Sequence, residues 1–144
     1  MKASTRKRAV SVFAATAMMV GAAVTIGAGT ASAAVPDNVR FVDTGLQSDG
    51  SRHIAVYQDG AFAGAAYWYA DGDKLQAVDP RKDGFGIAAY LGTSPIREAS
   101  TYGHSSPYTA TKTGDLPENR TYTYWVCIGG SSGQVCSDVY SAKS

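Results

Sequence analysis

The chain has 144 residues, with 13 Lys and Arg against 12 Asp and Glu and a formal net charge of +1. Four of the basic residues precede position 34, so the rest of the chain has nine basic and twelve acidic side chains, a net charge of −3. Nucleic acids and anionic membranes bind clustered basic charge, which this part of the chain lacks. We therefore expect no nucleic-acid partner and no membrane partner after residue 33.

Residues 1–33 have the three zones of a secretory signal peptide: a basic start, an apolar run from Ala9 to about Ala28 and a small-residue end. Ala31-Ser32-Ala33 fits the cleavage pattern, and Ser32-Ala33-Ala34 fits nearly as well. The alternative is an uncleaved membrane anchor, because an apolar run of about 20 residues can span a bilayer. The cleavage pattern favours a secreted, extracellular protein whose single domain covers residues 34–144.

Short β-like runs separated by Gly, Asp, Asn and Pro follow, and no helical apolar period is sustained. Asp59-Gly60 and Asp71-Gly72 are typical of two-residue type I′ turns, in which both positions need positive φ. With the final hairpin, about nine strands spaced at about 8–12 residues predict an all-β fold. It is expected to be an immunoglobulin-like antiparallel β-sandwich, with a small β-barrel as the alternative. The runs before the final hairpin are 39–43, 53–58, 61–70, 73–79, 85–91, 96–99 and 108–112.

Leu116 and Tyr122 are separated by Pro117 and a polar turn, and alternating apolar positions follow. This spacing resembles the tyrosine corner of fibronectin-type-III and other immunoglobulin-like sandwiches, in which a tyrosine hydroxyl bonds to the upstream backbone. The resemblance implies that Tyr122, Tyr124, Val126 and Ile128 face inward. Thr123, Trp125 and Cys127 then face outward.

Cys127 and Cys136 are the two cysteines of the chain, and in an exported protein they most simply form one disulfide. Closing this short loop stabilises the fold by about 2–3 kcal/mol in the chain-entropy model. If the two cysteines face each other across a hairpin, Thr123 lies opposite Tyr140. Trp125 and Tyr140 then become diagonal neighbours on the outer face, and we predict that they form a ligand-binding surface.

Other aromatic side chains occur on the run 61–70. Alternation places Phe62 and Trp68 on one face of that strand and Tyr67 and Tyr69 on the other. Outward rings can stack on sugars, as in carbohydrate-binding modules built on β-sandwiches. The competing interpretation is that they pack against cross-strand neighbours and loops.

Catalytic and metal-binding patterns are weak. Gly129 to Gly133 matches G-x-S-x-G, but that motif needs a strand before it and a helix after it, whereas here it forms a hairpin tip. His53 and His104 suit neither a triad nor a metal site by spacing. We expect no catalytic residue, no metal and no cofactor.

The acidic residues near positions 71–83 are the remaining cation candidates. Asp71, Asp73, Asp79 and Asp83 supply several carboxylates, which is what calcium prefers. They fail the EF-hand pattern because Leu75 occupies a ligand position. Aspartate in β-turns bonds to its own backbone without any metal, and we favour that role.

GDKLQAVDPRKDGFG and LPENRTYTYWVCIGGSSGQVC, within Asp71 to Cys136, are similar to a group of small secreted actinobacterial proteins. The resemblance implies secretion and a β fold, and it assigns no activity. Relatives often have a cysteine where Val78 stands, so here a single disulfide is implied.

Three functions follow as hypotheses. The first is a non-enzymatic module that binds a cell-wall or carbohydrate ligand. The alternatives are a secreted protease inhibitor, using the segment Gly92 to Pro107 or the hairpin tip, and a small secreted hydrolase with His104 in a cleft.

Overall fold

The structure is a computed structural model that describes residues 34–144, so the predicted signal peptide lies outside the described residues. This part of the chain forms ten strands and contains no helix long and apolar enough to cross a membrane. The strands are β1 (Val39–Asp43), β2 (Arg52–Gln58), β3 (Ala61–Tyr69), β4 (Lys74–Asp79), β5 (Gly86–Leu91), β6 (Arg97–Ser100), β7 (Tyr108–Lys112), β8 (Thr121–Gly130), β9 (Gly133–Cys136) and β10 (Tyr140–Lys143).

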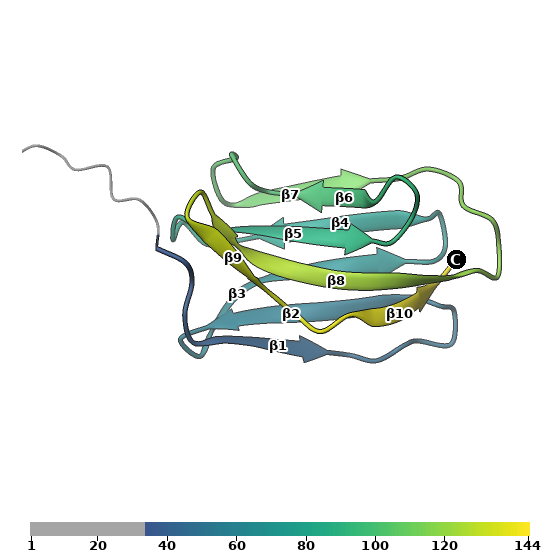
Figure 1. Ribbon diagram of the computed structural model, residues 1–144, viewed down its shortest axis with the longest axis horizontal. Coiled ribbons are helices and arrows are strands. Elements are labelled where there is room, and N and C mark those ends of the chain that lie inside the picture. The colour runs from purple at the N-terminus through teal and green to yellow at the C-terminus, as the bar shows by residue number, and fades with distance from the viewer. Residues whose placement is uncertain (1–33) are drawn as a thin grey trace, which may run out of the picture. The chain divides into compact units, whose positions relative to one another are not determined.

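The strands form two antiparallel sheets that pack face to face (Figure 1). Sheet A has the order β1-β2-β3-β4-β7, and sheet B has the order β10-β8-β5-β6, with β9 also paired to β8. The sheets do not close on each other. The predicted β-sandwich is therefore confirmed, and the alternative of a small barrel is wrong.

The first two tight turns differ from each other. Asp59 and Gly60 have φ values of 50° and 76°, which confirms the predicted turn between β2 and β3. In the next turn the positive values belong to Gly72 and Asp73, at 79° and 45°, so the prediction for Asp71-Gly72 is wrong by one residue. Asp73 is held in this turn by two hydrogen bonds: its N–H donates to the Ala70 carbonyl at 3.2 Å, and its carboxylate accepts the backbone N–H of Leu116 at 2.6 Å.

The core lies between the sheets, and Trp68 and Tyr124 are its largest fully buried side chains. A β-bulge in β3 changes the predicted alternation, because Val56 pairs with Gly64 while Tyr57 pairs with Phe62. The extra residue, Ala63, points into the core, and Phe62 turns outward with 42% of its surface exposed. The prediction that Phe62 shares the face of Trp68 is therefore wrong.

The final hairpin agrees with the prediction only in its first half. Cys127 and Cys136 are paired and form the predicted disulfide. Beyond them Tyr140 pairs with Tyr124, where the sequence predicted Thr123. The ladder slips by one residue because the Ser137 hydroxyl accepts the N–H of Val126 and donates to the Asp138 carbonyl. A side chain thus replaces a backbone group in the ladder, as at a β-bulge.

This slip decides which side of sheet B each ring occupies. Tyr124, Val126 and Ile128 belong to the core, as predicted. Tyr140 shares the side of Tyr124 and packs against the core, so it is not a neighbour of Trp125 on the outer face. The prediction of a joint Trp125 and Tyr140 surface is wrong.

Leu116 and Tyr122 both pack against the core. Their positions are compatible with a crossing between the sheets, since β7 belongs to sheet A and β8 to sheet B. The tyrosine-corner hydrogen bond, and with it the immunoglobulin-like likeness, stays a prediction.

Candidate functional site

The outer side of sheet B has a pair of stacked aromatic side chains that includes Trp125. Because partners in an antiparallel ladder share a face, Tyr90 lies directly beside Trp125 across β5 and β8. Their rings are nearly parallel, with an interplanar angle of 13° and centroids 5.1 Å apart. Both rings are partly exposed. The aromatic neighbour of Trp125 on the outer face is therefore Tyr90, where the sequence predicted Tyr140.

Tyr90 also contacts an acidic side chain. Glu98 of β6 pairs with Tyr90, and the Tyr90 hydroxyl donates to Glu98 Oε1 at 3.4 Å. Burial is the main reason why the pKa of Tyr90 is raised, and the nearby Glu98 carboxylate adds to the effect. The phenol is therefore a neutral hydrogen-bonding group at physiological pH.

A third ring comes from the loop between β6 and β7. Thr101 fixes this loop to β5, because its N–H donates to the Ile87 carbonyl at 2.9 Å and its hydroxyl accepts the Ile87 N–H at 2.8 Å. Tyr102 then lies on Gly86, where an added Cβ would be 2.5 Å from Tyr102 Cδ1. Its hydroxyl donates to Gln134 Oε1 of β9 at 3.2 Å. Burial, more than any neighbouring charge, raises the pKa of Tyr102 beyond its usual range.

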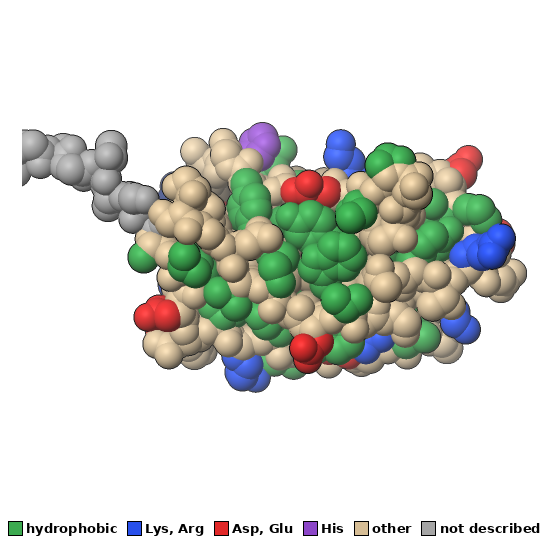
Figure 2. Space-filling model, viewed as in Figure 1, with side chains coloured by type: hydrophobic (Ala, Val, Ile, Leu, Met, Phe, Trp, Pro, Cys, Tyr) green, Lys and Arg blue, Asp and Glu red, His purple; other side chains and the backbone are tan. Residues whose placement is uncertain are grey.

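We call the three rings on this side of sheet B the outer aromatic face: Tyr90, Tyr102 and Trp125, with Glu98 at its margin. Ala88 and Cys127 pair with each other on the same outer side of the sheet, yet both have 0% exposed surface. Larger neighbouring side chains must therefore cover them. Figure 2 shows hydrophobic side chains gathered over the middle of this side of the molecule.

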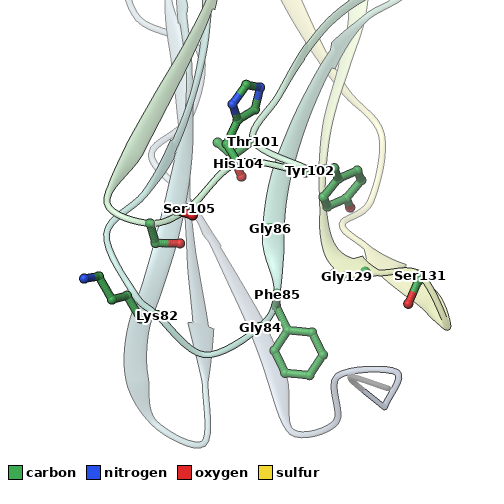
Figure 3. A pocket seen from close by; sticks show the side chains of 13 residues that line it. Lys82, Gly84, Phe85, Gly86, Thr101, Tyr102, His104, Ser105, Gly129 and Ser131 are labelled. Atoms are coloured by element: carbon green, nitrogen blue, oxygen red, sulfur yellow. The ribbon is translucent and has the colours of Figure 1, made fainter. Parts of the chain in front are cut away.

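A groove of about 690 Å³ adjoins the outer aromatic face at Tyr102. It lies between the loop after β6, the turn before β5 and the hairpin tip that joins β8 to β9. In Figure 3, Lys82 and Ser105 lie on one side of the groove, with Tyr102 and Ser131 on the other. Because Tyr102 belongs to both features, an extended ligand could occupy the face and the groove together.

His104 also lines this groove, so its geometry bears on the hydrolase hypothesis. Its ring stacks on Tyr108, with centroids 4.0 Å apart and an interplanar angle of 9°. The nearby carboxylate of Asp79 accepts the Ser106 hydroxyl at 2.5 Å and the Arg81 N–H at 3.1 Å. Within residues 34–144, no hydrogen bond joins the His104 imidazole to a serine or an aspartate. The structure does not bring these groups together as a triad.

Three of the four acidic turn residues, Asp73, Asp79 and Asp83, have structural partners. Asp79 and Asp83 each accept the N–H two residues ahead, and Asp83 lies 3.4 Å from Arg81 Nε. Burial raises the pKa of Asp79, opposed by its bond from Ser106. In the part of the chain that the structure describes, no three His, Cys, Asp or Glu side chains form a group that could hold a metal ion.

The two segments predicted for protease inhibition are both at the surface. β6 divides the stretch Gly92–Pro107 into two loops. The first is braced by the Thr93 hydroxyl, which donates to the Pro95 carbonyl at 2.7 Å, and it leaves 57% of Ile96 exposed. Ser131 and Ser132 are exposed at the hairpin tip.

His53 lies on the outer side of sheet A among tyrosine rings, away from the groove. Its ring centroid is 4.9 Å from that of Tyr67 and 5.3 Å from that of Tyr69. Its Nε2 is buried with no hydrogen-bond partner among the described residues. Burial lowers the pKa of His53, and Asp49 opposes this only in part.

The lowered pKa of His53 predicts a pH-dependent stability. Below the unfolded pKa of about 6.5 the unfolded chain binds more protons at this site than the folded chain, so stability falls as pH falls. We expect the free energy of unfolding of the native protein to decline between about pH 7 and pH 5. The free energy of unfolding of His53→Phe should decline less over the same range. Urea titrations of both proteins at each pH measure the difference. An equal decline in both proteins would contradict the prediction.

Sequence reasoning missed Tyr90 and Tyr102. The pairing of β5 with β8 joins residues far apart in the chain, and nothing near Tyr90 signals it. Tyr102 stands in a polar loop whose attachment depends on the Thr101 hydroxyl. Gly86 was the available signal, because glycine in a strand often marks the close approach of another group.

No protein-family model matches the chain, and no curated protein or solved structure matches it. The interpretation of the site therefore depends on its own geometry.

Proposed function

We propose that the protein is a secreted, non-enzymatic module that binds a cell-wall or other extracellular polysaccharide on its outer aromatic face. The observation that carries the proposal is the near-parallel pair of Tyr90 and Trp125 on the outer side of a β-sandwich. The disulfide supports an oxidising location, as in other exported proteins. Removal of residues 1–33 would release the domain from the membrane.

The chemistry of the face suits a sugar. Pyranose rings present C–H groups on one side, and these pack well on the electron-rich faces of Trp and Tyr. Sugar hydroxyls need hydrogen-bonding partners around such a contact, and Glu98 and Gln134 supply them. Binding sites of this kind combine apolar rings with a few polar groups that fix orientation.

The test is the change Trp125→Ala. We expect it to weaken retention on insoluble polysaccharide by at least about tenfold, because it removes the larger ring of the pair, and tenfold corresponds to about 1.4 kcal/mol. Sedimentation with chitin, chitosan, cellulose and peptidoglycan measures the bound fraction.

The matched control is Phe62→Ala, which removes an exposed ring from the outer side of sheet A. It should bind like the native protein. The proposal is wrong if the native protein is retained on none of these polymers, or if Phe62→Ala and Trp125→Ala reduce binding equally.

A further inference from the structure

Carboxylates border the outer aromatic face on two sides. Glu98 engages the Tyr90 hydroxyl through Oε1, and its side chain is otherwise exposed. Asp138 is exposed at the opposite border, directly after Ser137, whose N–H bonds to the Val126 carbonyl at 2.9 Å. Figure 2 shows acidic side chains on two opposite sides of the central hydrophobic patch.

Neither carboxylate is neutralised by a basic side chain. The two ion pairs in residues 34–144 are Arg52 with Asp43 and Arg81 with Asp83. The outward positions of β5 and β8 are Gly, Ala, Tyr, Thr, Trp and Cys, so these central strands place no cation on the face. The guanidinium of Arg97 of β6 donates hydrogen bonds to the backbone carbonyls of Asp73 and Gly114.

A ligand on this face therefore meets aromatic rings between two unpaired negative charges. An ammonium group is attracted both to the face of an aromatic ring and to a nearby carboxylate. A carboxylate or phosphate on the ligand would be repelled by Glu98 and Asp138. This charge complementarity selects among polysaccharides that would otherwise stack equally well.

We propose that the ligand is a cationic polysaccharide, a polymer of hexosamines with free amino groups. This inference rests on the proposed function, because it names the class of glycan for the same face. Sugar rings pack against the stacked pair of Trp125 and Tyr90, on the ring surfaces that the two residues leave free, and an ammonium group bonds to the free oxygen of Glu98. N-acetylated and neutral glycans retain the stacking and lose the ammonium contact.

Calorimetric titration with soluble oligosaccharides of equal length tests this. Glucosamine oligomers should bind at least about tenfold tighter than N-acetylglucosamine or glucose oligomers at low salt and mildly acidic pH. Oligogalacturonate should bind weakest. Raising the salt concentration should reduce the preference, because screening weakens exposed charge contacts.

Two variants assign the preference to its residues. Glu98→Gln should remove the preference, so that glucosamine and N-acetylglucosamine oligomers bind with about equal affinity. Glu118→Gln removes a negative charge from an exposed turn before β8 and should keep the native preference. Trp125→Ala should weaken binding of all the oligomers.

The outcomes separate the two proposals. Equal affinity for glucosamine and N-acetylglucosamine oligomers, with Trp125→Ala still defective, overturns the cationic ligand and leaves the glycan-binding function. A native preference retained in Glu98→Gln also overturns it. Absence of binding to every oligomer overturns the proposed function itself.

Discussion

Replacing Trp68 with alanine is expected to lower the free energy of unfolding by about 3–5 kcal/mol. Trp68 is the largest fully buried side chain, between two sheets that have no other element to fill the space it would leave. It also reaches across the sandwich, since its Nε1–H donates to the carbonyl of Lys143 at 2.7 Å. The change therefore removes apolar packing and a bond between β3 and β10 together.

Trp68→Phe separates these two contributions. Phenylalanine keeps most of the apolar volume but leaves the Lys143 carbonyl without its donor, which should cost about 1–3 kcal/mol. Urea denaturation followed by far-ultraviolet circular dichroism gives both values without depending on the tryptophan signal. Equal stability of Trp68→Phe and the native protein would show that the bond to Lys143 contributes nothing. If Trp68→Ala does not fold, the phenylalanine variant still decides the point.

The elements predicted correctly are those whose signals are local. Asp59-Gly60 sets the turn after β2, and the alternation of Ile54 and Val56 places their side chains in the core. Both signals act within a few residues, so one sequence contains all that they need. The disulfide belongs to the same class, because Cys127 and Cys136 are joined by a short hairpin.

Two predictions failed where a strand gained one residue. Ala63 reverses the side on which Phe62 lies, and the Ser137 hydroxyl does the same for Tyr140. A slip of one residue moves every following side chain to the other face. Gly64, next to Ala63, was a local signal for the first bulge, because glycine inside a strand often marks one. The second bulge, at Ser137, has no glycine or proline beside it, so the sequence continues to alternate where the strand does not.

Of the three principal residues of the candidate site, only Trp125 was predicted from the sequence. Trp125 faces outward as expected, because its parity is fixed by the inward Tyr124 and Val126 beside it. Tyr90 and Tyr102 join it only through long-range contacts, the pairing of β5 with β8 and the packing of Tyr102 on Gly86. A surface assembled from three separate segments has no sequence pattern of its own.

The slip at Ser137 also creates a contact between the sheets, and this gives the second large effect. Arg52 of β2 donates to both carboxylate oxygens of Asp43, at 2.7 and 2.6 Å, and its Nη1 donates to the carbonyl of Ser141 at 2.8 Å. Its guanidinium lies over the Tyr140 ring, 4.5 Å from the centroid. The Asp43 carboxylate is the main reason why the pKa of Arg52 is raised. The exposed fractions of the two side chains are 11% for Arg52 and 17% for Asp43.

Arg52→Met is therefore expected to lower the free energy of unfolding by about 2–4 kcal/mol, slightly less than for a fully buried pair. Most of this loss comes from the Asp43 carboxylate, which is left largely buried without its partner. Adding Asp43→Asn removes that charge, so the double variant should be more stable than Arg52→Met alone. Urea denaturation of both single variants and the double variant completes the cycle. If the two single effects simply add, Arg52 acts through Tyr140 and Ser141 of β10, and the ion pair does not stabilise the fold.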